Sequence, residues 1–200
     1  MRTTLLGLLL IASVFFVPNF GAETQAGTVP QINNIKAFSP FFDLGQGAVR
    51  IIAIVSPDCD ACAQTVDVIV DLFSAVSNNR LRAYLIVAPD PPSESALAAL
   101  RLFAKVTDRR VSCFWDPTGV ARAHWNSATG SESTAWDALF VYDTDAGSGA
   151  MGETQAYWVY DHQSSEFASP DAEALEAQVR ELLENFEERT RAEDTSPENP

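Results

Sequence analysis

The 200-residue chain reads Ile51-Ile52-Ala53-Ile54-Val55-Ser56-Pro57-Asp58-Cys59-Asp60-Ala61-Cys62 where an apolar run gives way to two cysteines. The run predicts a buried strand, and the residues after Cys62 have helical periodicity. A C-x-x-C pair at a helix start is reactive, because the free N–H groups and the positive dipole end stabilise a thiolate on the first cysteine. Cys62 lies one helical turn on, close enough to attack a mixed disulfide formed by Cys59. Outside this context the same spacing could supply half of a zinc site.

The N-terminus has the pattern of an export signal. Arg2 precedes an apolar stretch over residues 5–17, which is too short to span a bilayer comfortably. Small residues follow, and cleavage after Ala26 is expected, so that residues 1–26 form a signal peptide. An uncleaved membrane anchor is the alternative. Either way the rest of the chain is expected in a periplasmic or other extracytoplasmic compartment, where disulfides persist.

Composition limits the function classes. About 175 residues remain after the signal, enough for one domain with a sizeable core. The net charge of −14 excludes a general nucleic-acid binder and disfavours anionic membrane surfaces. Much of the acid lies near the C-terminus, where residues 188–200 are expected to form a disordered acidic tail.

Strand and helix patterns alternate along the chain. Residues 27–48 are expected to be a loop-rich lead-in, whose Phe38, Phe41 and Phe42 cover one edge of the core, and residues 49–187 form the domain. Strands are predicted at 49–55, 81–88, 111–115, 138–142 and 156–161. Helices are predicted after Cys62, after Ser93, from the turn at 116–119 through Trp125, and after Pro170. This order predicts a single α/β domain.

Four short motifs carry a resemblance to a known family. They are Ser56-Pro57-Asp58-Cys59-Asp60-Ala61-Cys62, Phe114-Trp115-Asp116-Pro117, Ala135-Trp136-Asp137 and His162-Gln163. With the element order, they resemble the thioredoxin-like superfamily, and within it a poorly characterised group of exported bacterial proteins. The resemblance implies a thioredoxin-like three-layer sandwich with a central mixed sheet and an inserted strand-helix element.

The resemblance also implies a site. Cys59 and Cys62 would be the catalytic pair and would form a disulfide with each other. Members of the superfamily place a cis-proline opposite this pair, but this chain has no proline between Pro117 and Pro170. Ala135-Trp136-Asp137 is expected to take its place and to line a substrate groove with Pro57. No cofactor and no metal is expected.

The proton chemistry of the pair is left open by the sequence. Where thioredoxin has a buried carboxylate, this chain has Ala53. Asp58 and Asp60 flank Cys59, and their charges would raise the pKa of its thiol, whereas the helix N-terminus would lower it. One of the two aspartates could instead cap the helix.

Other chemically competent residues have plainer interpretations. Cys113 lies in a predicted strand and is expected to be a buried, inert thiol. His124 is expected on a helix surface or half-buried, and Trp115 in the core. The role of His162, after the last strand, is left open.

Three functions from different classes are compatible with this sequence. The first is an exported thiol–disulfide oxidoreductase that acts through Cys59 and Cys62 on a protein or a small thiol or disulfide. The second is a thioredoxin-fold module that binds copper or zinc through the same thiolates, with Asp137 or a histidine completing the site. The third is a redox-inert interaction domain with a structural disulfide. A monomer is expected, and the first function is preferred.

Overall fold

The computed structural model describes residues 29–89, 92, 96–129, 137–147, 149, 158–161 and 170–195. The signal segment therefore lies outside the described residues. The strands are β1 (Val49–Val55), β2 (Leu81–Val87), β3 (Val111–Trp115), β4 (Asp137–Tyr142) and β5 (Trp158–Asp161). They form one sheet in the order β3-β2-β1-β4-β5. β1, β2 and β3 are parallel, whereas β4 and β5 are antiparallel to their neighbours, so the sheet is mixed.

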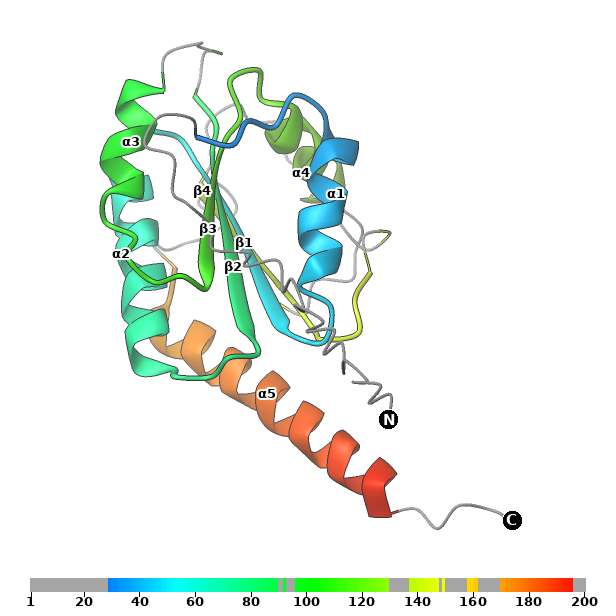
Figure 1. The fold of residues 1–200 in the computed structure, drawn as a ribbon. Helices are drawn as coiled ribbons and strands as arrows, with labels where there is room; N and C mark the ends of the chain where they lie inside the picture. Colours follow the sequence, from blue (N-terminus) through cyan, green and yellow to red (C-terminus); the bar gives the residue numbers. More distant parts are fainter. Residues whose placement is uncertain are drawn as a thin grey trace, which may run out of the picture.

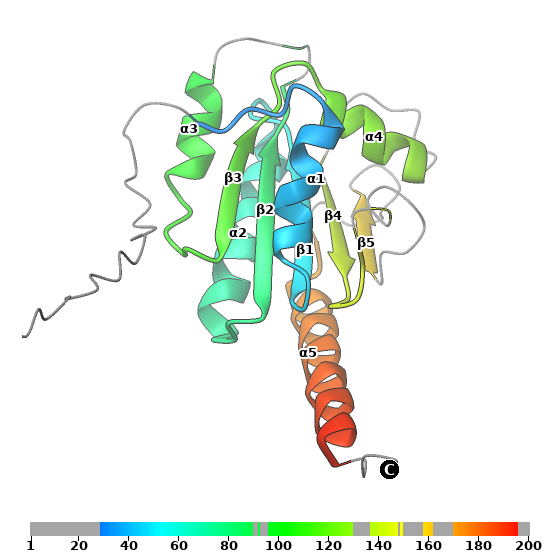
Figure 2. The same cartoon turned by 45° about the vertical axis from the view of Figure 1, so that its right-hand side comes forward.

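Helices cover both faces of this sheet (Figures 1 and 2). They are α1 (Ile35–Leu44), α2 (Asp60–Ala75), α3 (Leu97–Phe103), α4 (Val120–Thr129) and α5 (Ala172–Thr195). α2, α3 and α5 contribute to one apolar core, and α1 and α4 to the other. The predicted thioredoxin-like three-layer sandwich with a central mixed sheet is confirmed. The inserted strand and helix are β3, at the edge of the sheet, and α4.

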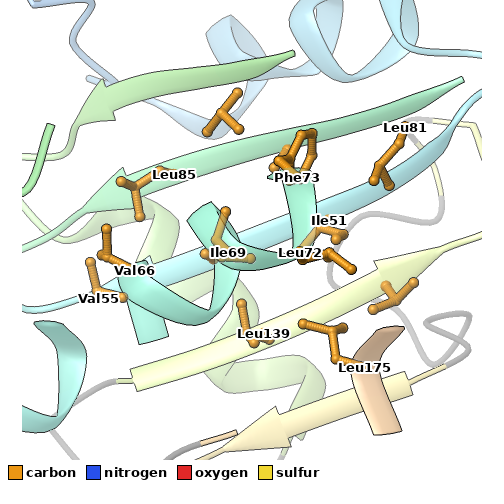
Figure 3. Packing of buried hydrophobic residues seen from close by; sticks show 14 of the residues in the cluster. Ile51, Val55, Val66, Ile69, Leu72, Phe73, Leu81, Leu85, Leu139 and Leu175 are labelled. Carbon is orange, nitrogen blue, oxygen red and sulfur yellow. The ribbon is translucent and has the colours of Figure 1, made fainter. Parts of the chain in front are cut away.

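Strand alternation assigns each residue of β1 to one of the two cores. The core shared with α2 receives the odd-numbered residues, which are Val49, Ile51, Ala53 and Val55. The core shared with α1 receives Ile52 and Ile54. Figure 3 shows the first core, where Val66 and Ile69 of α2 lie against Val55 and Leu139 of the sheet. β1 is buried along its whole length, as expected for a central parallel strand.

The lead-in differs from the sequence-based expectation. Residues 27–48 were expected to be loop-rich, but they contain α1, whose Asn34 cap accepts a hydrogen bond from the Ala37 N–H at 2.9 Å. Phe38 and Phe42 are buried against the sheet. Their burial stabilises a helix that contains Pro40, a residue that removes one backbone donor. The lead-in is therefore an integral part of the sandwich.

The C-terminal helix also extends beyond its expected end. α5 continues to Thr195, through the first residues of the segment 188–200 that was expected to be a disordered tail. Arg189 of this segment forms an ion pair with Asp143, at 3.3 Å between Nη2 and Oδ2. Among the described residues, no helix combines the length and the apolar character needed to cross a membrane.

Candidate active site

Cys59 occupies the N-cap position of α2. Its backbone is extended, and its Sγ accepts a hydrogen bond from the Cys62 N–H at 3.2 Å. The sulfur thus takes the place that an aspartate or serine oxygen usually takes at a helix start. The sequence left open whether Asp58 or Asp60 caps the helix, and the structure gives that role to Cys59. The cap position directs the positive end of the helix dipole at this sulfur.

Cys62 lies in the first turn of α2 and is fully buried, whereas Cys59 is half-buried. The Cys62 Sγ accepts a hydrogen bond from the Ser56 N–H at 3.3 Å. Both cysteines are thiols in the structure. The sequence predicted that Cys59 would lie at the helix start and be the more exposed of the two, and this is confirmed. An accessible thiol beside a sequestered one suits a division into attacking and resolving roles.

The electrostatic surroundings keep Cys62 protonated. Burial raises the pKa of its thiol far above the ordinary range, and the Asp137 carboxylate raises it further. The Cys59 side chain acts in the same direction, and the Ser56 N–H acts in the opposite one. Cys62 can therefore act as a nucleophile only if a base removes its proton during the reaction.

Asp137 is the first residue of β4 and is 1% exposed. It pairs with Val55, the last residue of β1. Sequence reasoning placed it in the substrate groove; in the structure its side chain is buried, and its charge acts on the Cys62 thiol. Pro57 is half-buried in the loop before Cys59. Ala135 and Trp136 lie outside the described residues, so the groove that they were expected to line stays a prediction. His162, whose role the sequence left open, also lies outside them.

Ser56 is a site residue that sequence reasoning missed. It follows β1, is buried, and supplies the backbone donor to Cys62. The available signal was its position at the end of a parallel strand, where free N–H groups face the start of the next helix. No group of three or more His, Cys, Asp or Glu side chains within the described ranges could hold a metal ion.

Cys113 lies on β3 and packs against the core that contains Cys62. β2 separates its strand from β1, the strand that leads into the cysteine pair. Cys113 is half-buried, whereas the sequence predicted a buried thiol. Burial nevertheless raises the pKa of Cys113 from its ordinary 9.0 to about 11. His124 is half-buried beside Trp125, and Trp115 is fully buried, as expected.

The raised pKa predicts slow alkylation of Cys113. Because only the thiolate reacts, its reactive fraction near neutral pH is about a hundredfold smaller than that of an ordinary thiol. The rate with iodoacetamide should rise tenfold per pH unit up to about pH 11. Peptide mass spectrometry after timed alkylation measures this rate. A plateau near pH 9 would contradict the prediction.

Comparisons with solved structures give distant likenesses. No family model matches the chain, and no curated protein does. A secreted disulfide oxidoreductase of Mycobacterium tuberculosis is 15% identical, with a TM-score of 0.47 over 68% of this chain and 84% of that one. A thioredoxin-family thiol:disulfide interchange protein of Chlorobium tepidum is 12% identical, with a TM-score of 0.48 over 70% and 83%. An exposed lipoprotein thioredoxin of Streptococcus pneumoniae is 14% identical, with a TM-score of 0.44 over 74% and 90%. Because these identities and TM-scores are low, the assignment of the fold rests on the strand order described above.

Proposed function

We propose that this chain is an exported thiol–disulfide oxidoreductase that acts through a Cys59–Cys62 dithiol–disulfide couple. One observation carries the proposal: the half-buried Cys59 Sγ caps α2 and accepts the Cys62 N–H, while Cys62 is buried one turn behind it. A helix N-terminus favours negative charge on the sulfur placed there. A merely structural disulfide has no need of this placement.

The reaction exchanges one disulfide for another. The Cys59 thiolate attacks a substrate disulfide, forms a mixed disulfide, and releases one half of the substrate as a thiolate. The Cys62 sulfur then loses its proton and attacks the Cys59 sulfur. The Cys59–Cys62 bond forms, the bond from Cys59 to the substrate breaks, and its electron pair leaves with the second substrate thiolate. The substrate is reduced, the pair is oxidised, and the reverse sequence oxidises a dithiol.

Export and substrate class belong to the same proposal. The basic residue and apolar run at the N-terminus support export, which would place the pair where disulfides persist. The substrate would be a protein or a small thiol or disulfide that enters a groove between Pro57 and Ala135-Trp136, the two residues that precede the buried Asp137. We expect the chain to act as a monomer without a cofactor.

The test is the redox equilibrium of the purified protein. It is equilibrated in glutathione buffers of known potential and quenched with acid. The remaining thiols are then alkylated in denaturant, where buried cysteines also react, and are counted by mass spectrometry. We expect Cys59 and Cys62 to disappear together, with Cys113 still alkylated, at a potential between roughly −270 and −120 mV. A potential below roughly −300 mV would instead indicate a structural disulfide.

The same titration separates the metal-binding alternative. It is repeated on protein treated with a chelator and on protein with one equivalent of Zn²⁺ added. An oxidoreductase should give the same potential after chelation as before it. If chelation shifts the potential and the isolated protein carries a stoichiometric metal, a metal-binding module becomes the better interpretation.

A further inference from the structure

We propose that Asp137 accepts the proton of the Cys62 thiol when Cys62 attacks the mixed disulfide. This inference rests on the proposed function, because it assigns a role within the same exchange reaction. It concerns the second step only, since the first needs no proton from Cys62. Asp137 would return the proton when the reaction runs in reverse.

The sheet register places Asp137 beside Cys62. In the antiparallel pair of β1 and β4, Asp137 lies opposite Val55, and such partners have Cα atoms roughly 5 Å apart. The next residue after Val55 is Ser56, whose N–H donates to the Cys62 Sγ at 3.3 Å. The carboxylate and the thiol are therefore held at the same strand end.

Strand alternation then directs the Asp137 side chain toward α2. Leu139 and Val141 of β4 face the core that contains Cys62 and Val66 of α2. Asp137 is two residues before Leu139, and the register with β1 is continuous, so its side chain lies on the same face. Figure 3 shows Leu139 and Val55 on this face, under the helix. Asp137 thus lies in the layer between sheet and helix.

Burial makes this carboxylate a suitable partner for a buried thiol. Asp137 is 1% exposed and Cys62 is fully buried, so a proton that leaves Cys62 needs an acceptor inside the protein. The residues of β1 that face α2 carry no titratable group, because they are Val49, Ile51, Ala53 and Val55. The charges of Asp137 and Cys59 both act on Cys62. Cys59 carries the sulfur that Cys62 attacks, so of these two groups Asp137 is the one that can accept the proton.

The proton and electron balance is complete. The Cys62 S–H proton moves to an oxygen of Asp137, and the freed electron pair forms the bond to Cys59. The substrate thiolate leaves with the electron pair of the broken bond and takes a proton from water. Asp137 later loses its proton to water, and no further oxidant or reductant is needed.

The experiment follows ring closure in stopped flow. Reduced protein is mixed with 5,5′-dithiobis(2-nitrobenzoate), which Cys59 attacks with release of one nitrothiobenzoate. Closure by Cys62 releases the second, as a separate phase. At pH 7 we expect Asp137→Asn to slow this second phase by about a hundredfold or more, the usual contribution of a positioned base. The difference should shrink as the pH rises, because hydroxide replaces the missing base.

A purely electrostatic role predicts the opposite sign. If Asp137 only raises the pKa of Cys62, its neutralisation increases the thiolate fraction, and Asp137→Asn closes the ring faster than the wild type. Faster or unchanged closure would overturn the proposal. Asp71→Asn is the matched control. It removes an exposed charge from α2, the helix that carries Cys62, and it should close the ring at the wild-type rate.

Two further readouts keep the test decisive. If Asp137→Asn does not fold, Asp137→Glu retains the acid, and its closure at more than a tenth of the wild-type rate supports the proposal. Slower closure in a folded Asp137→Glu, with unchanged Cys59 alkylation, overturns it. If the wild type itself never releases the second nitrothiobenzoate, the proposed function fails rather than the role of Asp137.

Discussion

Replacing Cys59 with serine is expected to abolish disulfide reduction, by a factor on the order of a thousand or more. The sulfur at this position caps α2 and is the more accessible of the pair. A serine hydroxyl can still cap the helix, but it is almost never ionised near neutral pH and cannot form a disulfide. The measurement is the reduction of insulin by the protein with dithiothreitol as the electron source. Activity close to that of the wild type would refute the assignment.

Cys62→Ser should fail in a different way. Cys59 can still attack, but no second thiol closes the ring, so the mixed disulfide with the substrate should accumulate. Mass spectrometry of the unreduced protein would show this adduct in Cys62→Ser and not in Cys59→Ser. The opposite pattern, with adducts on Cys62, would contradict the roles inferred from burial. Cys113→Ser is the matched control and should keep the wild-type activity and form no adduct of its own.

The fold was predictable where the signal is local. β1 and β3 have the bounds that the sequence predicted, because both are short apolar runs between turn residues. α1 was missed because Pro40 lies inside it, and proline disfavours the interior of a helix. Its stability comes from the burial of Phe38 and Phe42, a tertiary effect that no local pattern reports.

The candidate site was predictable in its residues but not in its geometry. The C-x-x-C pair and its helix follow from spacing, and the proximity of Asp137 to the pair follows from the resemblance. The pairing of Asp137 with Val55 joins residues far apart in sequence, and only this register shows that the carboxylate acts on Cys62. The role of Ser56 is a backbone role, so its side chain gave no signal.

The role of Arg50 could not be predicted from the sequence, because a single arginine hardly alters the apolar pattern of β1. In the structure it is fully buried. Its guanidinium donates to the carbonyls of Ala48 and Phe42 at 3.2 Å each, and to that of Asp143 at 2.8 Å. It also donates to the carbonyls of Thr144 and Ala146. The Arg50 Cζ lies 4.2 Å from the centre of the Phe42 ring. One side chain thus joins the end of α1, the start of β1 and the turn after β4.

This arrangement predicts a large loss of stability for Arg50→Met. Methionine keeps much of the apolar stem but leaves several buried carbonyls without a donor, and each hydrogen bond to a charged group contributes about 1.5–3 kcal/mol. Because the side chain still fills part of the space, we expect the free energy of unfolding to fall by about 3–5 kcal/mol. Urea unfolding followed by circular dichroism measures the change.

Arg82→Met is the control that separates the loss of the Arg50 hydrogen bonds from a general effect of losing an arginine. Arg82 is the Cα partner of Arg50 on β2, but it is only half-buried, and its hydrogen bonds go to the nearby carbonyls of Asn79 and Leu81. Its replacement should lower the free energy of unfolding by no more than about 1 kcal/mol, because its hydrogen bonds are local and its side chain is partly exposed. Equal losses of unfolding free energy in the two variants would mean that the contacts of Arg50 with the three segments add no particular stability. If the Arg50 hydrogen bonds to the three segments stabilise the fold, Arg50→Met should lower the free energy of unfolding more than Arg82→Met does. Arg50→Lys should cause an intermediate loss, because lysine keeps the charge but lacks the planar fork of donors.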